Sequence, residues 1–140
     1  MRKPFTTYAS SRFVDPEAVR ESLRACAERL LERRPEVEAV HLFGSFASGR
    51  ATPRSDADIL VEIEDRSASL QDDIRTEAAG LFLEAPVPVD LFVMTSAALA
   101  ENRRQGRGIA GAVARDGVLL ARAPSSDTGN ARTPVTGQAS

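Results

Sequence analysis

The chain has 140 residues, which suits one domain, with 42% hydrophobic and 27% charged residues and a net charge of −2. The lack of a basic excess argues against direct nucleic-acid binding, and no apolar run approaches the ~20 residues of a membrane span. One cysteine and one histidine exclude an internal disulfide and a structural zinc site. With no signal-peptide pattern at the N-terminus, we expect a cytoplasmic protein that binds neither membrane nor nucleic acid.

The first helix is expected after an N-terminal arm, residues 1–14, that shows no apolar period. Asp15 suits the N-cap of a helix, and Pro16 suits its first position, where a missing amide hydrogen costs nothing. Apolar residues then recur at helical spacing until Pro35, which ends the helix. The stripe comprises Val19, Leu23, Cys26, Ala27, Leu30 and Leu31.

Two strands and a second long helix are expected next. Residues 37–43 and 57–63 are rich in valine, isoleucine and leucine, which predicts strands. Gly44-Ser45 ends the first of these strands, and a short helix through about residue 51 should follow. Apolar residues at helical spacing then predict an amphipathic helix over 70–81.

The later part of the chain continues the alternation. Residues 89–94 predict a third strand, and a helix over 97–101 follows that Thr95 or Ser96 can cap. The polar, glycine-containing stretch 103–108 predicts a loop.

The last elements are expected to close one domain over residues 15–123. A short helix over 109–115 precedes a final strand over 118–121. Residues 124–140 offer little apolar surface to bury, so we expect a disordered tail. The alternation of helices and strands predicts an α/β (α+β) domain with a mixed sheet of about four strands flanked by helices.

Residues suited to phosphate and metal binding surround the first two strands. Gly44 follows a strand directly, where glycine permits a sharp turn and a close approach of phosphate, and Ser45 adds a hydroxyl donor. Asp56 and Asp58 stand two apart, so they project from one face. Carboxylates this close repel one another unless a cation lies between them, and oxygen ligands of this kind suit magnesium.

A third carboxylate, Asp90, stands inside the apolar strand 89–94. Burial without a partner would be costly, so the side chain needs solvent, an arginine or a cation. If this strand lies beside that of Asp56 and Asp58, the three carboxylates form a cage for two magnesium ions about 3.5–4 Å apart.

The order of these motifs resembles the minimal nucleotidyltransferases of the DNA polymerase β-like superfamily. The shared pattern is Gly-Ser-x-x-x-Gly, here residues 44–49, then Ser-Asp-x-Asp at 55–58, then Asp90 on a later strand. The likeness covers most of residues 37–121 and implies the polymerase β-like fold. The chain departs from the pattern at Ser48, where many relatives carry arginine; Arg50 and Arg54 stand nearby.

The resemblance implies a magnesium-dependent nucleotidyltransferase that uses ATP. Gly44 and Ser45 would hold the terminal phosphates, and Asp56 and Asp58 would bind both metal ions. Asp90 would complete the second metal site and help to deprotonate the attacking hydroxyl. The resemblance further implies transfer of AMP onto a hydroxyl of a partner protein, a small helical HEPN-type toxin for which the chain is the antitoxin.

Two other functions stay open. Small-molecule nucleotidyltransferases of the aminoglycoside type usually carry an additional helical domain, for which we expect no space in 140 residues. A degenerate domain could bind only nucleotide or a partner, although the presence of all three aspartates argues against that hypothesis. The apolar helices also leave scope for a homodimer.

Several other side chains are expected to be structural. His41 is interpreted as a packed or half-exposed strand residue rather than a catalytic base. The acidic run Glu62, Glu64 and Asp65 is expected to solvate the end of its strand. The core is expected to contain Phe43, Phe82 and Phe92.

Overall fold

The computed structural model describes residues 15–52, 54–64 and 68–124. The predicted arm at 1–14 and the predicted tail, apart from its first residue, lie outside the described residues. The elements are α2 (Pro16–Arg33), β2 (Val37–Phe43), α3 (Ser45–Ser48), β3 (Ala57–Ile63), α4 (Ala68–Phe82), β4 (Val89–Thr95), α5 (Ser96–Gln105), α6 (Gly108–Asp116) and β5 (Val118–Arg122).

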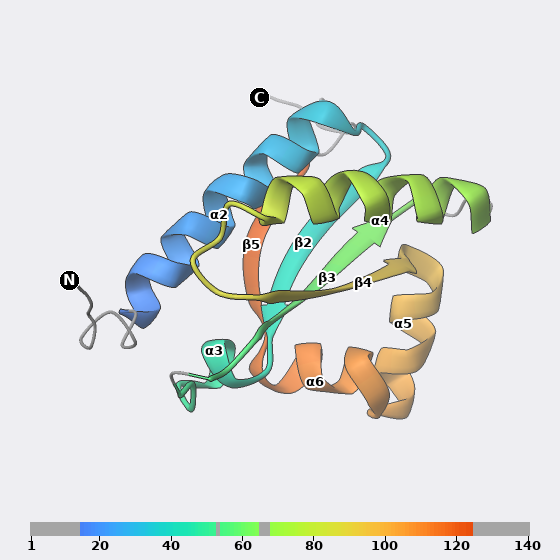
Figure 1. Ribbon diagram of the computed structural model, residues 1–140. Coiled ribbons are helices and arrows are strands. Elements are labelled where there is room, and N and C mark those ends of the chain that lie inside the picture. Colours follow the sequence, from blue (N-terminus) through green and yellow to red (C-terminus); the bar gives the residue numbers. More distant parts are fainter. Residues whose placement is uncertain (1–14, 53, 65–67, 125–140) are drawn as a thin grey trace, which may run out of the picture.

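The four strands form one mixed sheet in the order β4-β3-β2-β5. β2 is antiparallel to both β3 and β5, whereas β3 and β4 are parallel. A parallel pair needs a crossover connection, and α4 supplies it. Figure 1 shows α2 and α4 together along one side of the sheet and α5 and α6 on the other. The predicted α/β domain with a mixed sheet of about four strands is confirmed.

The start of α2 follows the predicted capping pattern. The Asp15 carboxylate accepts a hydrogen bond of 3.1 Å from the backbone N–H of Glu17, and Pro16 takes the first helical position. The predicted stripe faces the sheet, with Leu31 partly buried and the others fully buried: Val19, Leu23, Cys26, Ala27 and Leu30. None of the helices in the described ranges is long and apolar enough to cross a membrane.

The alternation of side chains along β3 divides the hydrophobic core into two parts. Ala57, Ile59, Val61 and Ile63 pack with α2 and α4 in the larger cluster, whereas Leu60 belongs to a smaller cluster with α5 and α6. The smaller cluster comprises Phe43, Leu60, Leu99, Ala110 and Val113. Because side chains two apart in a strand share a face, Asp58 and Glu62 point to the same side as Leu60.

Two boundaries differ from the prediction because glycine decides where a helix ends. α3 stops at Ser48, since Gly49 takes the left-handed conformation at φ 84°. α5 continues to Gln105, where Gly106 at φ 71° caps it, so the predicted loop over 103–108 is largely helical. Arginine and glutamine are good helix formers, and their polarity alone does not indicate a loop. The other elements begin and end within two residues of the predicted positions.

Candidate active site

Asp58 and Asp90 are direct neighbours in the sheet. The parallel register of β3 and β4 pairs these two residues, on strands that are generally about 4.8 Å apart. Phe92 and Met94 share the parity of Asp90 and pack against the smaller cluster, so Asp90 faces the same side as Asp58. Asp56 stands one residue before β3. The two aspartate-bearing strands are therefore neighbours, which is the condition that the three-carboxylate hypothesis required.

Gly44 lies against the carboxylate of Asp58. The antiparallel register pairs Phe43 with Asp58, which brings the next residue, Gly44, to the edge where the carboxylates begin. Its backbone takes φ 80°, and a Cβ atom there would lie 2.3 Å from Oδ2 of Asp58. Any side chain at position 44 would thus strain the backbone and displace the carboxylate.

The turn from Gly44 to Arg50 is held by its own backbone. The N–H groups of Ala47 and Ser48 donate to the carbonyl of Gly44 at 3.1 and 3.0 Å. The Ser48 hydroxyl donates to the carbonyl of Ser45 at 3.5 Å, and the N–H of Arg50 donates to the same carbonyl at 3.0 Å. These bonds fix the turn that carries Ser45, next to Gly44.

The segment before Asp56 is fixed by a compact turn between Thr52 and Ser55. The Ser55 hydroxyl accepts from the N–H of Thr52 at 2.8 Å, and the N–H of Ser55 donates to the carbonyl of Thr52 at 3.0 Å. The N–H of Arg54 also donates to the Thr52 hydroxyl at 3.3 Å. These bonds set the point from which Asp56 enters β3.

Electrostatics link the three carboxylates. Burial raises the pKa of Asp58, and the charges of Asp90 and Asp56 raise it further. Among the described residues, no three His, Cys, Asp or Glu side chains converge closely enough to hold a metal ion as they stand. Carboxylates repel one another, so a bound cation would have to draw the three side chains together. Their oxygen donors are of the kind that magnesium prefers.

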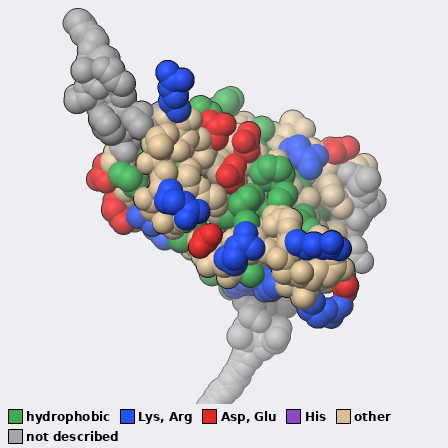
Figure 2. Space-filling model, turned by 90° about the horizontal axis from the view of Figure 1, so that it is seen from below, with side chains coloured by type: hydrophobic (Ala, Val, Ile, Leu, Met, Phe, Trp, Pro, Cys, Tyr) green, Lys and Arg blue, Asp and Glu red, His purple; other side chains and the backbone are tan. Residues whose placement is uncertain are grey.

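The carboxylates are open to solvent. Asp56 and Asp90 are exposed and Asp58 is half-buried. Figure 2, seen from below the view of Figure 1, shows acidic side chains gathered beside hydrophobic ones. β4 is an edge strand, so nothing in the described sheet covers Asp90 on its outer side. Asp56 and Asp90 are therefore accessible from solvent in this fold.

A second polar group on the same face was misjudged from the sequence. Glu62 does not solvate the strand end: its side chain is 13% exposed and lies 3.0 Å from Nε2 of His41. Ser96, at the start of α5, donates its hydroxyl to the other carboxylate oxygen at 2.7 Å. The alternation of Asp58, Leu60 and Glu62 was the available signal, because it places all three on one face. His41 is buried, as expected.

The three phenylalanines belong to the core. Phe43 and Phe82 are buried as predicted, and Phe92 is partly buried with its ring centroid 5.8 Å from that of Phe43.

An apolar groove of about 430 Å³ lies beside β4, and no carboxylate lines it. Its lining is Ala79, Phe82, Leu83, Ala85, Pro86, Val87, Pro88, Val89 and Leu91. Val89 and Leu91 have the opposite parity to Asp90, so this groove is not part of the carboxylate site.

Comparison with known families identifies the class. A family model described as a nucleotidyltransferase domain matches residues 23–106, more than half of the chain. The chain therefore belongs to the nucleotidyltransferase domain family. The matched segment contains Gly44, Asp56, Asp58 and Asp90. A search of curated proteins found no match.

Solved structures agree with this fold. A Sulfolobus solfataricus protein assigned as a nucleotidyltransferase is 20% identical, with a TM-score of 0.54 over 82% of this chain and 90% of that chain. The polymerase β-like fold predicted from the motifs is thereby confirmed.

Two further structures are more distant. A toxin–antitoxin structure with AMP-PNP is 24% identical, with a TM-score of 0.47 over 74% of this chain and 77% of that chain. A tri-AMPylated Shewanella oneidensis HEPN toxin in complex with its MNT antitoxin gives 18% identity and a TM-score of 0.43 over 78% and 74%. These two superpose too loosely to add to the fold assignment.

Proposed function

We propose that this chain is a magnesium-dependent nucleotidyltransferase whose metal ions are held by Asp56, Asp58 and Asp90. The main support is the pairing of Asp58 with Asp90 on a face that also presents Gly44, in a chain of the nucleotidyltransferase family. Carboxylates on two neighbouring strands offer the hard oxygen ligands that magnesium prefers together with substrate phosphates.

The side chains divide the work of phosphoryl transfer. Bound magnesium would neutralise charge on the phosphates and make the attacking hydroxyl more acidic. Gly44 lets the backbone of its turn lie directly against the Asp58 carboxylate, so that the terminal phosphates, held by this turn, would lie beside the metal ions. The Ser45 hydroxyl donates a hydrogen bond to those phosphates. Asp90, exposed on the edge strand, accepts the proton of the attacking hydroxyl. The hydroxyl oxygen bonds to the α-phosphorus as the bond to the bridging oxygen breaks, and pyrophosphate leaves.

The donor in this proposal is ATP, and the acceptor is a hydroxyl on a small helical protein of the HEPN type, which the chain counters as an antitoxin. This finer assignment rests on the motif order over residues 44–58 together with Asp90. The open approach to Asp56 and Asp90 is compatible with a macromolecular acceptor.

The reaction is tested by supplying ATP and magnesium to the chain co-purified with a small helical HEPN-type protein. Mass spectrometry should then find the partner heavier by one or more AMP units, with pyrophosphate released. Asp56→Asn and Asp58→Asn should lose the product. Asp73→Asn, an exposed carboxylate on α4, is the matched control and should keep full activity.

Two outcomes would contradict the proposal at different levels. Full transfer in Asp58→Asn, or transfer in a chelator without divalent cations, would overturn the metal-based mechanism. Transfer to an aminoglycoside, with none to the helical partner, would leave the nucleotidyltransferase in place and make the acceptor assignment wrong.

A further inference from the structure

The arginines of the α2 and α4 layer are neutralised by acidic side chains. Ion pairs of 2.8–3.4 Å hold Arg20, Arg24, Arg29, Arg33, Arg34 and Arg75. Exposed pairs of this kind add little to stability, but they leave this side of the molecule without a concentrated positive charge.

The segment that contains α5 and α6 carries an unbalanced positive charge. Residues 102–115 include four arginines and no acidic residue, in a chain whose net charge is −2. Arg104 pairs with Glu101. Within the described part of the chain, the side chains of Arg103 and Arg115 form neither an ion pair nor a hydrogen bond. The charge of this segment is therefore mostly not neutralised by the fold.

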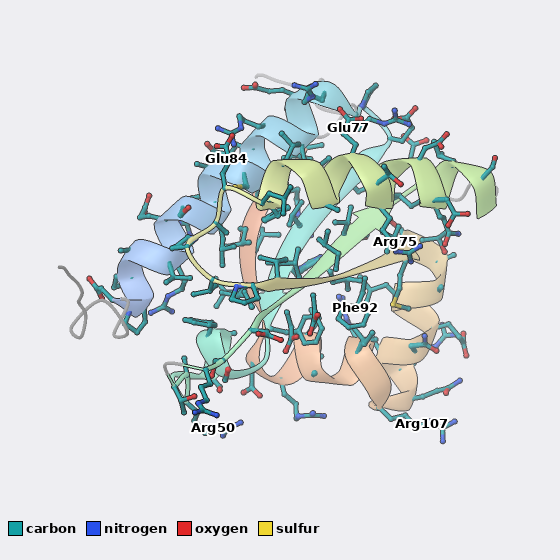
Figure 3. All side chains as sticks on the ribbon, in the orientation of Figure 1. Arg50, Arg75, Glu77, Glu84, Phe92 and Arg107 are labelled. Carbon is teal, nitrogen blue, oxygen red and sulfur yellow. The ribbon has the colours of Figure 1, made fainter. Side chains whose placement is uncertain are left out.

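Three of these arginines meet where α5 joins α6. The N–H of Gly106 donates to the carbonyl of Arg103 at 3.0 Å, and that of Gly111 donates to the carbonyl of Arg107 at 3.1 Å. A Cβ atom on Gly111 would lie 2.7 Å from the carbonyl carbon of Gly106 and 3.3 Å from Nη1 of Arg115, so this guanidinium group lies at the same junction. All three arginine side chains are exposed, and Figure 3 shows that of Arg107 directed away from the sheet. We term this surface the α5–α6 corner.

The α5–α6 corner lies on the side of the sheet that carries the carboxylates. Leu60 and Phe92, which share the parity of Asp58 and Asp90, pack in the smaller cluster with residues of α5 and α6. Figure 2 shows basic, acidic and hydrophobic side chains together on the face seen from below, where α6 lies. A protein bound at the corner would therefore lie on the side from which Asp90 is open to solvent.

The charges around the corner favour an acidic protein over a nucleic acid. Glu101 and Asp116 flank the arginines along the chain, and Asp56 and Asp90 are exposed on the same side. A phosphate backbone that continued beyond the corner would meet these negative charges, whereas an acidic protein surface can be limited to the corner. Arginine is also enriched in protein–protein interfaces, and partly exposed Ile109 adds apolar surface beside the arginines.

We infer that the α5–α6 corner, formed by Arg103, Arg107 and Arg115, is the docking surface for an acidic patch on the acceptor protein. The inference rests on the proposed function and deepens it, because it states where the helical partner binds and what charge its surface carries. Complementary charge steers the encounter of the two proteins and orients the acceptor before its hydroxyl reaches Asp90.

Calorimetric titration of the full chain with a purified small helical HEPN-type protein tests the corner. Combined Arg103→Ala, Arg107→Ala and Arg115→Ala should weaken binding about tenfold at about 0.05 M salt and less than about twofold at about 0.5 M, where exposed charges are screened. Lysine at the same three positions keeps the charge and should bind within about threefold of wild type. Because all three side chains are exposed, both variants should melt at the wild-type temperature.

The matched control removes three arginines from the other layer. Combined Arg24→Ala, Arg33→Ala and Arg75→Ala, in α2 and α4, change the net charge equally and should bind the helical protein as wild type does. In the transfer assay, the corner variant should show a KM for the helical protein raised about tenfold and an unchanged kcat, because no arginine of the corner belongs to the carboxylate site.

The outcomes separate this inference from the proposed function. Unchanged affinity and KM in the corner variant, with transfer intact, would overturn the docking surface alone. Equal weakening in the control variant would overturn it as well, since net charge would then suffice. Binding that depends on the corner but never leads to transfer would overturn the proposed function and keep the surface.

Two further results would replace the partner itself. Failure of the wild-type chain to bind the helical protein would overturn the acceptor assignment and the docking surface together. Binding of a single-stranded RNA of about 20 nucleotides through the same arginines, with affinity for the helical protein unchanged in the corner variant, would make the corner a nucleic-acid site and the inference wrong.

Discussion

Position 44 requires glycine for two reasons. The backbone takes φ 80°, and the space a side chain would fill is occupied by the Asp58 carboxylate. Gly49, five residues further on, takes almost the same φ, 84°, but has no atom within 4 Å of a Cβ position. The two glycines therefore separate the effect of backbone strain from the effect of a collision.

Substitution of these glycines should show the difference. Gly44→Ala and Gly49→Ala should each lower the free energy of unfolding by about 1–3 kcal/mol through left-handed strain. Only Gly44→Ala should also abolish transfer, because the new methyl group pushes the Asp58 carboxylate away. Urea unfolding and a transfer assay on both variants measure this. Comparable loss of transfer in Gly49→Ala would show that strain, and not displacement of Asp58, limits activity.

Because Asp58 is partly buried beside two other carboxylates, we predict that its charge lowers the stability of the fold although the reaction requires it. Burial, Asp90 and Asp56 all raise the pKa of Asp58, so its ionised form opposes folding. Asp58→Asn keeps the shape without the charge, so the melting temperature without divalent cations should rise by roughly 2–4 °C. Transfer should fall by at least about a hundredfold. A lower melting temperature than wild type, by calorimetry, would show that the carboxylate is not under repulsion.

At the scale of elements, Glu62 joins three of them. It projects from β3, meets His41 of β2 and accepts from Ser96, the first residue of α5. The helix is thus tied to this end of the sheet through a partly buried polar contact. Neighbouring Leu60, Phe92 and Leu99 supply the apolar contacts. Because the same face carries Asp58 and Asp90, the contact also holds the layer next to the carboxylates.

The contribution of Glu62 to stability should depend on pH. The hydrogen bond with His41 is the main cause that lowers the pKa of Glu62, against burial, which raises it. A carboxyl whose pKa falls on folding stabilises the fold above its unfolded pKa, near 4.5, and loses this as pH drops through the folded value. Glu62→Gln should therefore cost about 1.5–3 kcal/mol near neutral pH and less below about pH 4.

Urea unfolding of wild type and variant at the two pH values measures this difference. Glu84→Gln provides the control, since Glu84 is 69% exposed in its pair with Arg29. That exposed pair should contribute no more than about 1 kcal/mol at either pH. An equal cost of Glu62→Gln at both pH values would show that the ionised form of Glu62 has no special role.

For the molecule as a whole, the carboxylates lie on the face of the sheet that α5 and α6 partly cover, and Asp56 and Asp90 are exposed to solvent there. The larger core, beneath α2 and α4, holds β3 in place, and the smaller core lies beneath α5 and α6, while Asp56 and Asp90 are exposed. The site therefore combines a rigid support with open access along the edge strand β4.

Binding of the nucleotide should stabilise this whole domain. A ligand that binds only the folded state at about 100 times its dissociation constant adds about 2.7 kcal/mol to the free energy of unfolding. Thermal unfolding with ATP should show the increase when magnesium is present and lose it in chelator. For Asp56→Asn, ATP should add little to the free energy of unfolding, whether magnesium or chelator is present. Equal stabilisation by ATP in magnesium and in chelator would mean that the carboxylates do not hold the metal.

Much of the architecture follows from local properties of the sequence. Strands 37–43 and 57–63 were predicted with their observed bounds, because each is an apolar run rich in β-branched residues and bounded by turn residues. The Gly44-Ser45 turn and the spacing of Asp56 and Asp58 were likewise visible, since both depend on neighbouring residues. The length of α5 was not, because polar helix formers were mistaken for a loop.

The sequence by itself determined the class of fold, the candidate residues for phosphate and metal binding, and their order along the chain. Only the tertiary structure decided that Asp58 pairs with Asp90, that the carboxylate of Asp58 fills the space at Gly44, and that Glu62 is half-buried against His41. Those contacts join residues far apart in the chain. Periodicity describes which face a side chain takes, whereas strand order and register decide which other side chain it meets.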